Sequence, residues 1–219
     1  MESFFFSTTG FWIGLSLWMT SIIADSTISR KSLGSIYRSN RLLYAKGQFA
    51  NTLNLLGIGP MLYGGIRSTV LTEKGNFSPY ELNASHLALI LALQNIGYFV
   101  SHKCFHLSPK FYRFHKFHHK FDKILIPSLG NAVSPTEFIV AYMTPFAVGS
   151  LATFPTEITF AAALYIVGLL NMVIHCQELN SVNYPKFIVS PKKHSKHHIV
   201  RKKHYAAPFI DIDAILENE

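Results

Sequence analysis

Charge and cysteine are the two things that this 219-residue sequence has little of. Only 15% of the residues are charged, whereas 49% are hydrophobic and the mean hydropathy is +0.22. One small water-soluble core cannot hide so much apolar surface, so the composition excludes an ordinary soluble domain and favours a membrane protein. The two cysteines, Cys104 and Cys176, are too few for a disulfide framework. The sequence also lacks an internal repeat, a low-complexity tract and a basic segment ahead of its first apolar run, so we expect no cleaved signal peptide.

Apolar runs alternate with polar, basic segments along the chain. The runs predict an all-α, multi-pass membrane bundle of about 4–5 spanning or hairpin helices. They cover approximately residues 4–24, 49–71, 84–100, 137–154 and 157–176. The last two runs are joined at Pro155, and so short a connection favours a helical hairpin.

The positions of the basic residues predict how the chain crosses the membrane. Cytosolic loops of membrane proteins carry an excess of lysine and arginine. If residues 25–48, 101–135 and 177–219 are cytosolic, every strongly basic segment lies on one face. The segment 72–83 then lies on the other face, with Lys74 as its only cation. The net charge of +8 is explained by these loops, and we expect no nucleic-acid partner.

Eight of the eleven histidines occur in three tight groups. Residues three or four apart on a helix share a face, so each group is expected to present its imidazoles together. Neutral imidazole is a good ligand for iron, zinc and copper. A random chain of this composition would contain H-x-x-H-H about 0.03 times, so two copies indicate one metal site built from three segments. The groups are His102 and His106; His115, His118 and His119; and His194, His197 and His198.

This H-x3-H, H-x2-H-H and distant H-x2-H-H pattern resembles that of the fatty acid hydroxylase/sterol desaturase superfamily of membrane di-iron enzymes. The segments 111–121 and 134–137 are also similar to stretches that the superfamily has around and after its second group. The resemblance covers about residues 85–215. It implies a hydroxylase-like catalytic domain in 85–219, preceded by N-terminal membrane helices and loops in 1–84, within one integrated membrane unit.

The resemblance also implies a set of metal ligands, and no catalytic side chain beyond them. His175 joins the set because superfamily members often have a histidine at the end of the span before the third group. His204 precedes Tyr205 where many relatives have Asn-Tyr-Gly, which leaves open whether His204 binds metal or fills the place of the asparagine. The nine implied ligands of two iron ions are His102, His106, His115, His118, His119, His175, His194, His197 and His198.

The resemblance implies hydroxylation or desaturation of a lipid, either a sterol or a fatty acyl or sphingolipid substrate. O2 would be the co-substrate, and NAD(P)H would supply electrons through a separate cytochrome b5-type donor and its reductase. The expected location is the endoplasmic reticulum membrane, with the histidine motifs facing the cytosol. Zinc could replace iron during purification, because an all-histidine site also binds zinc.

Three alternative interpretations fit the sequence less well. A zinc metalloprotease needs a glutamate directly after its first histidine, and Lys103 occupies that place. A non-catalytic, histidine-rich membrane protein for metal binding or transport would favour ionisable residues within the spans, which are nearly free of them. An inactive relative would have no reason to keep all eight motif histidines.

Overall fold

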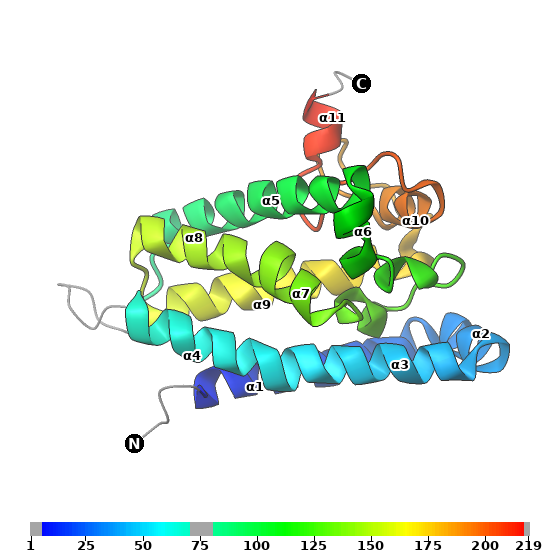
Figure 1. The fold of residues 1–219 in the computed structure, drawn as a ribbon, viewed down its shortest axis with the longest axis horizontal. Coiled ribbons are helices and arrows are strands. Elements are labelled where there is room, and N and C mark those ends of the chain that lie inside the picture. The colour runs from blue at the N-terminus through cyan, green and yellow to red at the C-terminus, as the bar shows by residue number, and fades with distance from the viewer. Residues whose placement is uncertain (1–5, 71–80, 217–219) are drawn as a thin grey trace.

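The computed structural model describes residues 6–70 and 81–216, and within these ranges the protein is built of helices (Figure 1). The one pairing of extended backbone described there is an isolated antiparallel bridge between Ile188 and Ile210. The all-α prediction is therefore confirmed. The α-helices are α1 Thr8–Thr27, α2 Arg30–Ser39, α3 Arg41–Thr52, α4 Gly59–Thr69, α5 Ala84–Leu107, α6 Pro109–His115, α7 Pro135–Glu137, α8 Thr144–Thr153, α9 Glu157–Ile174, α10 Pro191–Val200 and α11 Ile212–Leu216. The π- and 3₁₀-helical segments are η1 Leu53–Ile58, η2 His118–Lys120, η3 Pro127–Asn131, η4 Phe138–Met143 and η5 Gln177–Leu179.

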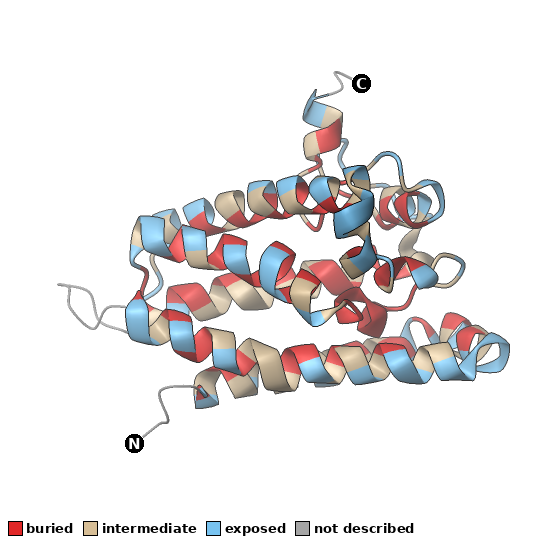
Figure 2. Ribbon diagram, in the orientation of Figure 1, coloured by how far each residue is buried: buried red, intermediate tan, exposed pale blue. Residues whose placement is uncertain are grey.

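The long helices pack side by side as a bundle. Helix α5 packs against α8 and α9, and α1 packs against α4 and α9. Buried residues lie on the inner faces of these helices, as Figure 2 shows. The outer faces carry exposed apolar side chains such as Trp12, Met19, Ile96 and Leu151. Apolar side chains on the outside of apolar helices are suited to contact with lipid, as in a membrane protein.

Two helices, α5 and α9, are long and apolar enough to cross a membrane. Helices α1 and α2, which are bent by 90° relative to each other, make a third candidate if the pair counts as one span. Two further helical runs, 41–69 and 135–153, match the apolar stretches expected at 49–71 and 137–154. Each is divided by a π-helical segment into pieces of at most 12 residues. The expected 4–5 spanning or hairpin helices thus correspond to α5, α9, the α1–α2 pair and these two interrupted runs.

Two glycines allow α1 to approach its neighbours closely. A Cβ atom on Gly14 would lie 2.0 Å from the carbonyl oxygen of Leu55 in η1. A Cβ atom on Gly168 of α9 would lie 2.7 Å from Cδ1 of Leu17 in α1. Small residues at such contacts are how membrane helices bring their backbones together. Because α1 packs against α9, helices from the predicted N-terminal part, 1–84, and the predicted catalytic part, 85–219, share one bundle. The boundary between these parts at residue 84 stays a prediction.

The basic segments lie together at one end of the bundle. Helices α2, α6 and α10 come from the three segments that the charge pattern assigned to one face, 25–48, 101–135 and 177–219, and they share that end in Figure 1. The connection between α8 and α9 lies at the opposite end. Most of the segment expected on the opposite face, 72–83, lies outside the described residues. The one-sided arrangement of the described basic segments agrees with the predicted topology.

Candidate metal centre

The first two histidine groups are brought together by a sharp turn after α5. His102 and His106 lie one helical turn apart near the C-terminal end of α5. Ser108 then adopts an extended conformation before Pro109, the first residue of α6. A proline disfavours helical backbone in the residue before it, so α5 ends there and α6 starts in a new direction. Helix α6 packs back on α5 and carries His115 at its last position.

The third group lies on α10, and His175 comes from the end of α9. The Ser190 hydroxyl accepts a hydrogen bond from the Lys193 amide and caps the start of α10. The helix ends at Arg201, which has a left-handed backbone with φ of 63°. All three histidines of α10 are buried, and His175 follows directly on the last residue of α9.

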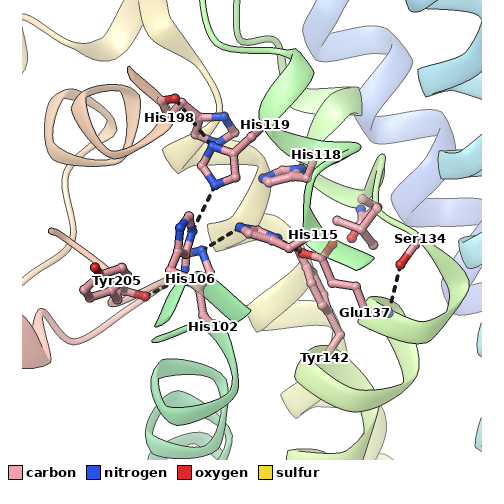
Figure 3. Close-up of polar contacts among 12 residues, drawn as sticks. His102, His106, His115, His118, His119, Ser134, Glu137, Tyr142, His198 and Tyr205 are labelled. Carbon is pink, nitrogen blue, oxygen red and sulfur yellow. Dashed lines mark hydrogen bonds and ion pairs between the residues drawn. The ribbon is translucent and has the colours of Figure 1, made fainter. Parts of the chain in front are cut away.

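The structure gathers all nine predicted ligands into two groups, each with its candidate ligand atoms within 4.8 Å of one another. The five-histidine group contains His102, His106, His115, His119 and His197. The four-histidine group contains His118, His175, His194 and His198. His118 and His119 are adjacent in the sequence yet belong to different groups (Figure 3). The expectation that each motif presents its imidazoles from one helix face is wrong for the second motif, because α6 ends at His115 and His118 and His119 lie in η2. The third motif does lie on one helix, α10, with all three histidines buried, although His197 belongs to the five-histidine group and His194 and His198 to the four-histidine group.

The spacing of the ring nitrogens fits metal coordination. Two nitrogens that each lie about 2.1 Å from one metal, at the angles of tetrahedral or octahedral geometry, are roughly 3.0–3.4 Å apart. Five pairs of Nε2 atoms in the structure are separated by 3.0 to 3.3 Å. The pairs are His102–His115, His106–His119, His118–His175, His175–His194 and His194–His198.

The hydrogen bonds made by Nδ1, here called the outer ring nitrogen, show where some of the imidazoles carry their proton. A carbonyl oxygen only accepts hydrogen bonds, so an Nδ1 atom beside one carries the proton and Nε2 keeps its lone pair. In three ligands Nδ1 lies 2.7 to 2.9 Å from a backbone carbonyl oxygen. The pairs are His102 with Tyr205, His175 with Asn171, and His197 with Lys203. The Nε2 atoms of these rings therefore offer lone pairs to the interior of the two groups.

Glu137 fixes a further ligand in the same way, and sequence reasoning gave it no role. Its side chain is 1% exposed, and its Oε1 atom lies 2.6 Å from Nδ1 of His115. The lone pairs on Nε2 of His115 and His102 then face each other at 3.0 Å, which is repulsive unless a cation lies between them. A carboxylate behind a metal-binding histidine is the usual outer partner of such a ligand. The signal in the sequence was a glutamate at the very start of an apolar run.

Burial keeps the ligands neutral. Removal from water lowers the pKa of His115, His118, His194 and His198 well below the usual histidine range, and neighbouring histidines lower it further. Burial also lowers the pKa of His197 to about 4. Imidazoles with such low pKa values are unprotonated at neutral pH, so their lone pairs are available to metals.

His204, the residue left open by the sequence, belongs to neither histidine group. Its backbone is left-handed, with φ of 61°, a conformation in which asparagine and histidine are both enriched. The carbonyl groups on either side of it, those of Lys203 and Tyr205, hold the outer nitrogens of His197 and His102. The structure thus places His204 in a loop that orients ligands, outside both histidine groups.

The comparisons with known proteins agree with this geometry. Residues 87–218 match the fatty acid hydroxylase family, which is more than half of the chain. The protein therefore belongs to that family, part of the sterol desaturase/fatty acid hydroxylase superfamily. Neither the comparison with curated proteins nor that with solved structures gives a match. Family membership, the helical bundle and the two histidine groups together define a membrane oxidoreductase that acts on lipid.

Proposed function

We propose that this protein is a di-iron, O2-dependent enzyme that hydroxylates or desaturates a lipid, either a sterol or a fatty acyl or sphingolipid substrate. The observation that carries the proposal is the pair of neighbouring histidine groups, with five and four imidazoles, inside a bundle of this family. Imidazole ligands suit iron, and two groups provide for two ions. When bound, the irons supply the oxidising chemistry that no amino-acid side chain provides, with O2 as co-substrate.

The residues of the chain hold and insulate this centre. The carbonyl groups of Tyr205, Lys203 and Asn171 fix the protons of three ligands on Nδ1. Glu137 accepts a hydrogen bond from His115 and makes that imidazole a stronger donor to a metal. Eight of the nine histidines are buried, so most of the site is shielded from bulk water.

We further propose that an acidic electron donor of the cytochrome b5 type docks at the basic end of the bundle, where NAD(P)H is the ultimate reductant. An open cavity of about 530 Å³ lies there, and its lining includes Lys46, Lys116, Lys120 and Arg201. His119 of the five-histidine group also lines this cavity. Basic residues around an opening that reaches a metal ligand would attract an acidic protein and bring its cofactor near the iron.

The proposed location is the endoplasmic reticulum membrane, with this basic end in the cytosol. The positive-inside rule supports the orientation, because the basic segments share one end of the bundle. In this orientation lipid would enter from the bilayer, while electrons would arrive from the cytosol.

The experiment compares lipids from cells that express the wild-type protein or the double variant His118→Ala, His119→Ala, which removes one ligand from each group. The host makes both sterols and sphingolipids, and His86→Ala is the matched control because His86 belongs to neither group. We expect a lipid with one added oxygen or double bond in the wild type and the control, and its absence from the double variant. Identical profiles, with iron bound and the donor reduced, would contradict the proposal. Bound metal with no lipid change would favour the alternative of a non-catalytic metal-binding or transport protein.

A further inference from the structure

An apolar pocket lies inside the bundle, with a volume of about 70 Å³. Helices α1, α4, α8 and α9 and the segments η1 and η4 surround it, and its lining includes Ile13, Leu55 and Leu164. The amide side chains of Asn131 and Asn171 also line it. Apart from them the lining is almost entirely apolar, as expected for a site that receives a lipid chain.

The backbone beside the two amide side chains adjoins the four-histidine group. Asn171 lies one helical turn before His175. The backbone carbonyl oxygen of Asn171 accepts a hydrogen bond of 2.7 Å from Nδ1 of His175. The backbone of η3 also lies near this ligand, because a Cβ atom added to Gly130 would lie 3.1 Å from Nδ1 of His175. A chain in the pocket that reaches Asn171 would therefore lie one helical turn from the ligand His175.

The Nδ2 atom of Asn131 carries two N–H donors, and nothing among the described residues accepts from either. The side chain of Asn131 is only 4% exposed, and its Oδ1 atom accepts a bond of 3.3 Å from Nδ2 of Asn171. Its Nδ2 atom is buried and has no partner in the described part of the chain. The neighbouring Tyr142 hydroxyl is already committed, since it donates to the carbonyl of Gly130 at 3.0 Å. A buried N–H group without an acceptor is unfavourable, so this site is suited to a ligand that brings one.

We infer that Nδ2 of Asn131 donates a hydrogen bond to an oxygen atom of the lipid whose chain occupies this pocket. The inference rests on the proposed function and narrows its substrate. The lipid carries a hydroxyl or carbonyl oxygen near the carbon that reacts, and a plain hydrocarbon chain is a poor ligand. Asn131 is then a positioning residue that selects the substrate and sets its depth.

The test uses two photoreactive alkyl probes of equal length, one with a terminal hydroxyl group and one without. Each is added to the full-length protein in lipid nanodiscs, and mass spectrometry measures labelling of the pocket residues Leu55 and Leu164. Labelling of the outward-facing Trp12 and Leu151 corrects for the amount of each probe in the bilayer. One net hydrogen bond corresponds to a preference of about 3- to 10-fold for the hydroxyl probe in the wild type.

Two variants with leucine in place of a buried amide separate the proposed contact from general effects. Asn131→Leu is expected to bring the ratio of the two probes to about 1, whereas Asn131→Ser, which keeps a donor, retains part of the preference. Asn51→Leu is the control, because both polar atoms of that buried side chain lack partners in the described residues and it does not line the pocket. Asn51→Leu should keep the wild-type ratio.

Three results would overturn the inference: equal pocket labelling by both probes in the wild type, an unchanged ratio in Asn131→Leu, or the same loss in Asn51→Leu. If Asn131 binds only an ordered water, the wild type shows no preference, which is the first of these. Labelling needs neither iron nor turnover. A protein that oxidises no lipid can therefore still show the preference, so failure of this inference and failure of the proposed function are read separately.

Discussion

The two histidine groups differ in how the protein holds them. In the five-histidine group, four rings have an oxygen partner for Nδ1: His102, His115, His119 and His197. In the four-histidine group, His175 has such a partner and the backbone of Ala132 approaches His118, whereas Nδ1 of His194 and of His198 is buried without a partner in the described residues. Oxygen partners fix the tautomer and the orientation of a ring before metal arrives. We therefore expect the five-histidine group to bind iron more tightly.

The groups also differ in what surrounds them. His119 lines the open basic cavity, and His106 is half-buried, so the five-histidine group lies toward solvent. The four histidines of the other group are all buried, and His175 adjoins the apolar pocket. The difference suggests a division of roles in which electrons reach the five-histidine side and lipid reaches the four-histidine side.

The largest effect is expected when either group loses a ligand. His106→Ala damages the five-histidine group and His118→Ala the four-histidine group. Both should lower the rate of lipid oxidation by at least about 10- to 100-fold, because a lost ligand costs at least as much as a lost outer partner. Product formation with purified protein and a chemical reductant is the measurement. A variant that keeps more than a tenth of the wild-type rate would show that its group is dispensable.

Glu137→Gln sharpens the comparison, since Glu137 contacts only the five-histidine group. Loss of the carboxylate behind His115 should weaken iron binding at that group by about 10- to 100-fold and leave the other group near its wild-type affinity. Titration with ferrous iron, read by absorbance or calorimetry, measures both binding steps, one at each histidine group. Ser134→Ala is the control, because Ser134 caps the amide of Glu137 without touching a histidine. Equal weakening of both steps would contradict the assignment.

Acid should destabilise the metal-free protein, and here both groups act alike. Burial lowers the pKa of His197 to about 4, below the usual value of 6.5. Below pH 6.5 the unfolded chain therefore takes up a proton that the folded chain does not, so stability falls as pH falls from 6.5 toward 4 and is constant above that window. Thermal unfolding between pH 7.5 and 4.5 measures this. His197→Gln should show a smaller fall, and a pH-independent midpoint in the wild type would contradict the account.

The smallest effect is expected at the basic cavity. Lys120→Glu reverses an exposed charge that lines it and should raise the KM for an acidic donor about 2- to 5-fold, with a weaker dependence on salt. The rate with a small chemical reductant should not change. Lys186→Glu, an exposed lysine that does not line this cavity, is the control. An equal rise in KM for both variants would indicate general electrostatics instead of a docking site.

Much of this architecture was predictable because it depends on local patterns. Apolar runs and basic segments predicted the all-α bundle and the shared end of the basic segments. The motifs and the family resemblance predicted the nine histidines that gather at the site, but not their division into two groups. The division of His118 from His119 was not predictable, since it depends on where α6 ends and how α10 packs between the groups. Glu137 and the carbonyls of Lys203 and Tyr205 were missed for a related reason. Their roles depend on tertiary packing, and a backbone carbonyl has no signature in a sequence.

The number of iron ions per chain tests the central claim most directly. Purified metal-free protein is titrated with ferrous iron without oxygen, and bound iron is measured after removal of the excess. We predict two irons per wild-type chain, the first bound more tightly, and weaker binding of one of the two irons in each of His106→Ala and His118→Ala. Saturation at one iron or none in the wild type would contradict a two-metal centre built from these two groups.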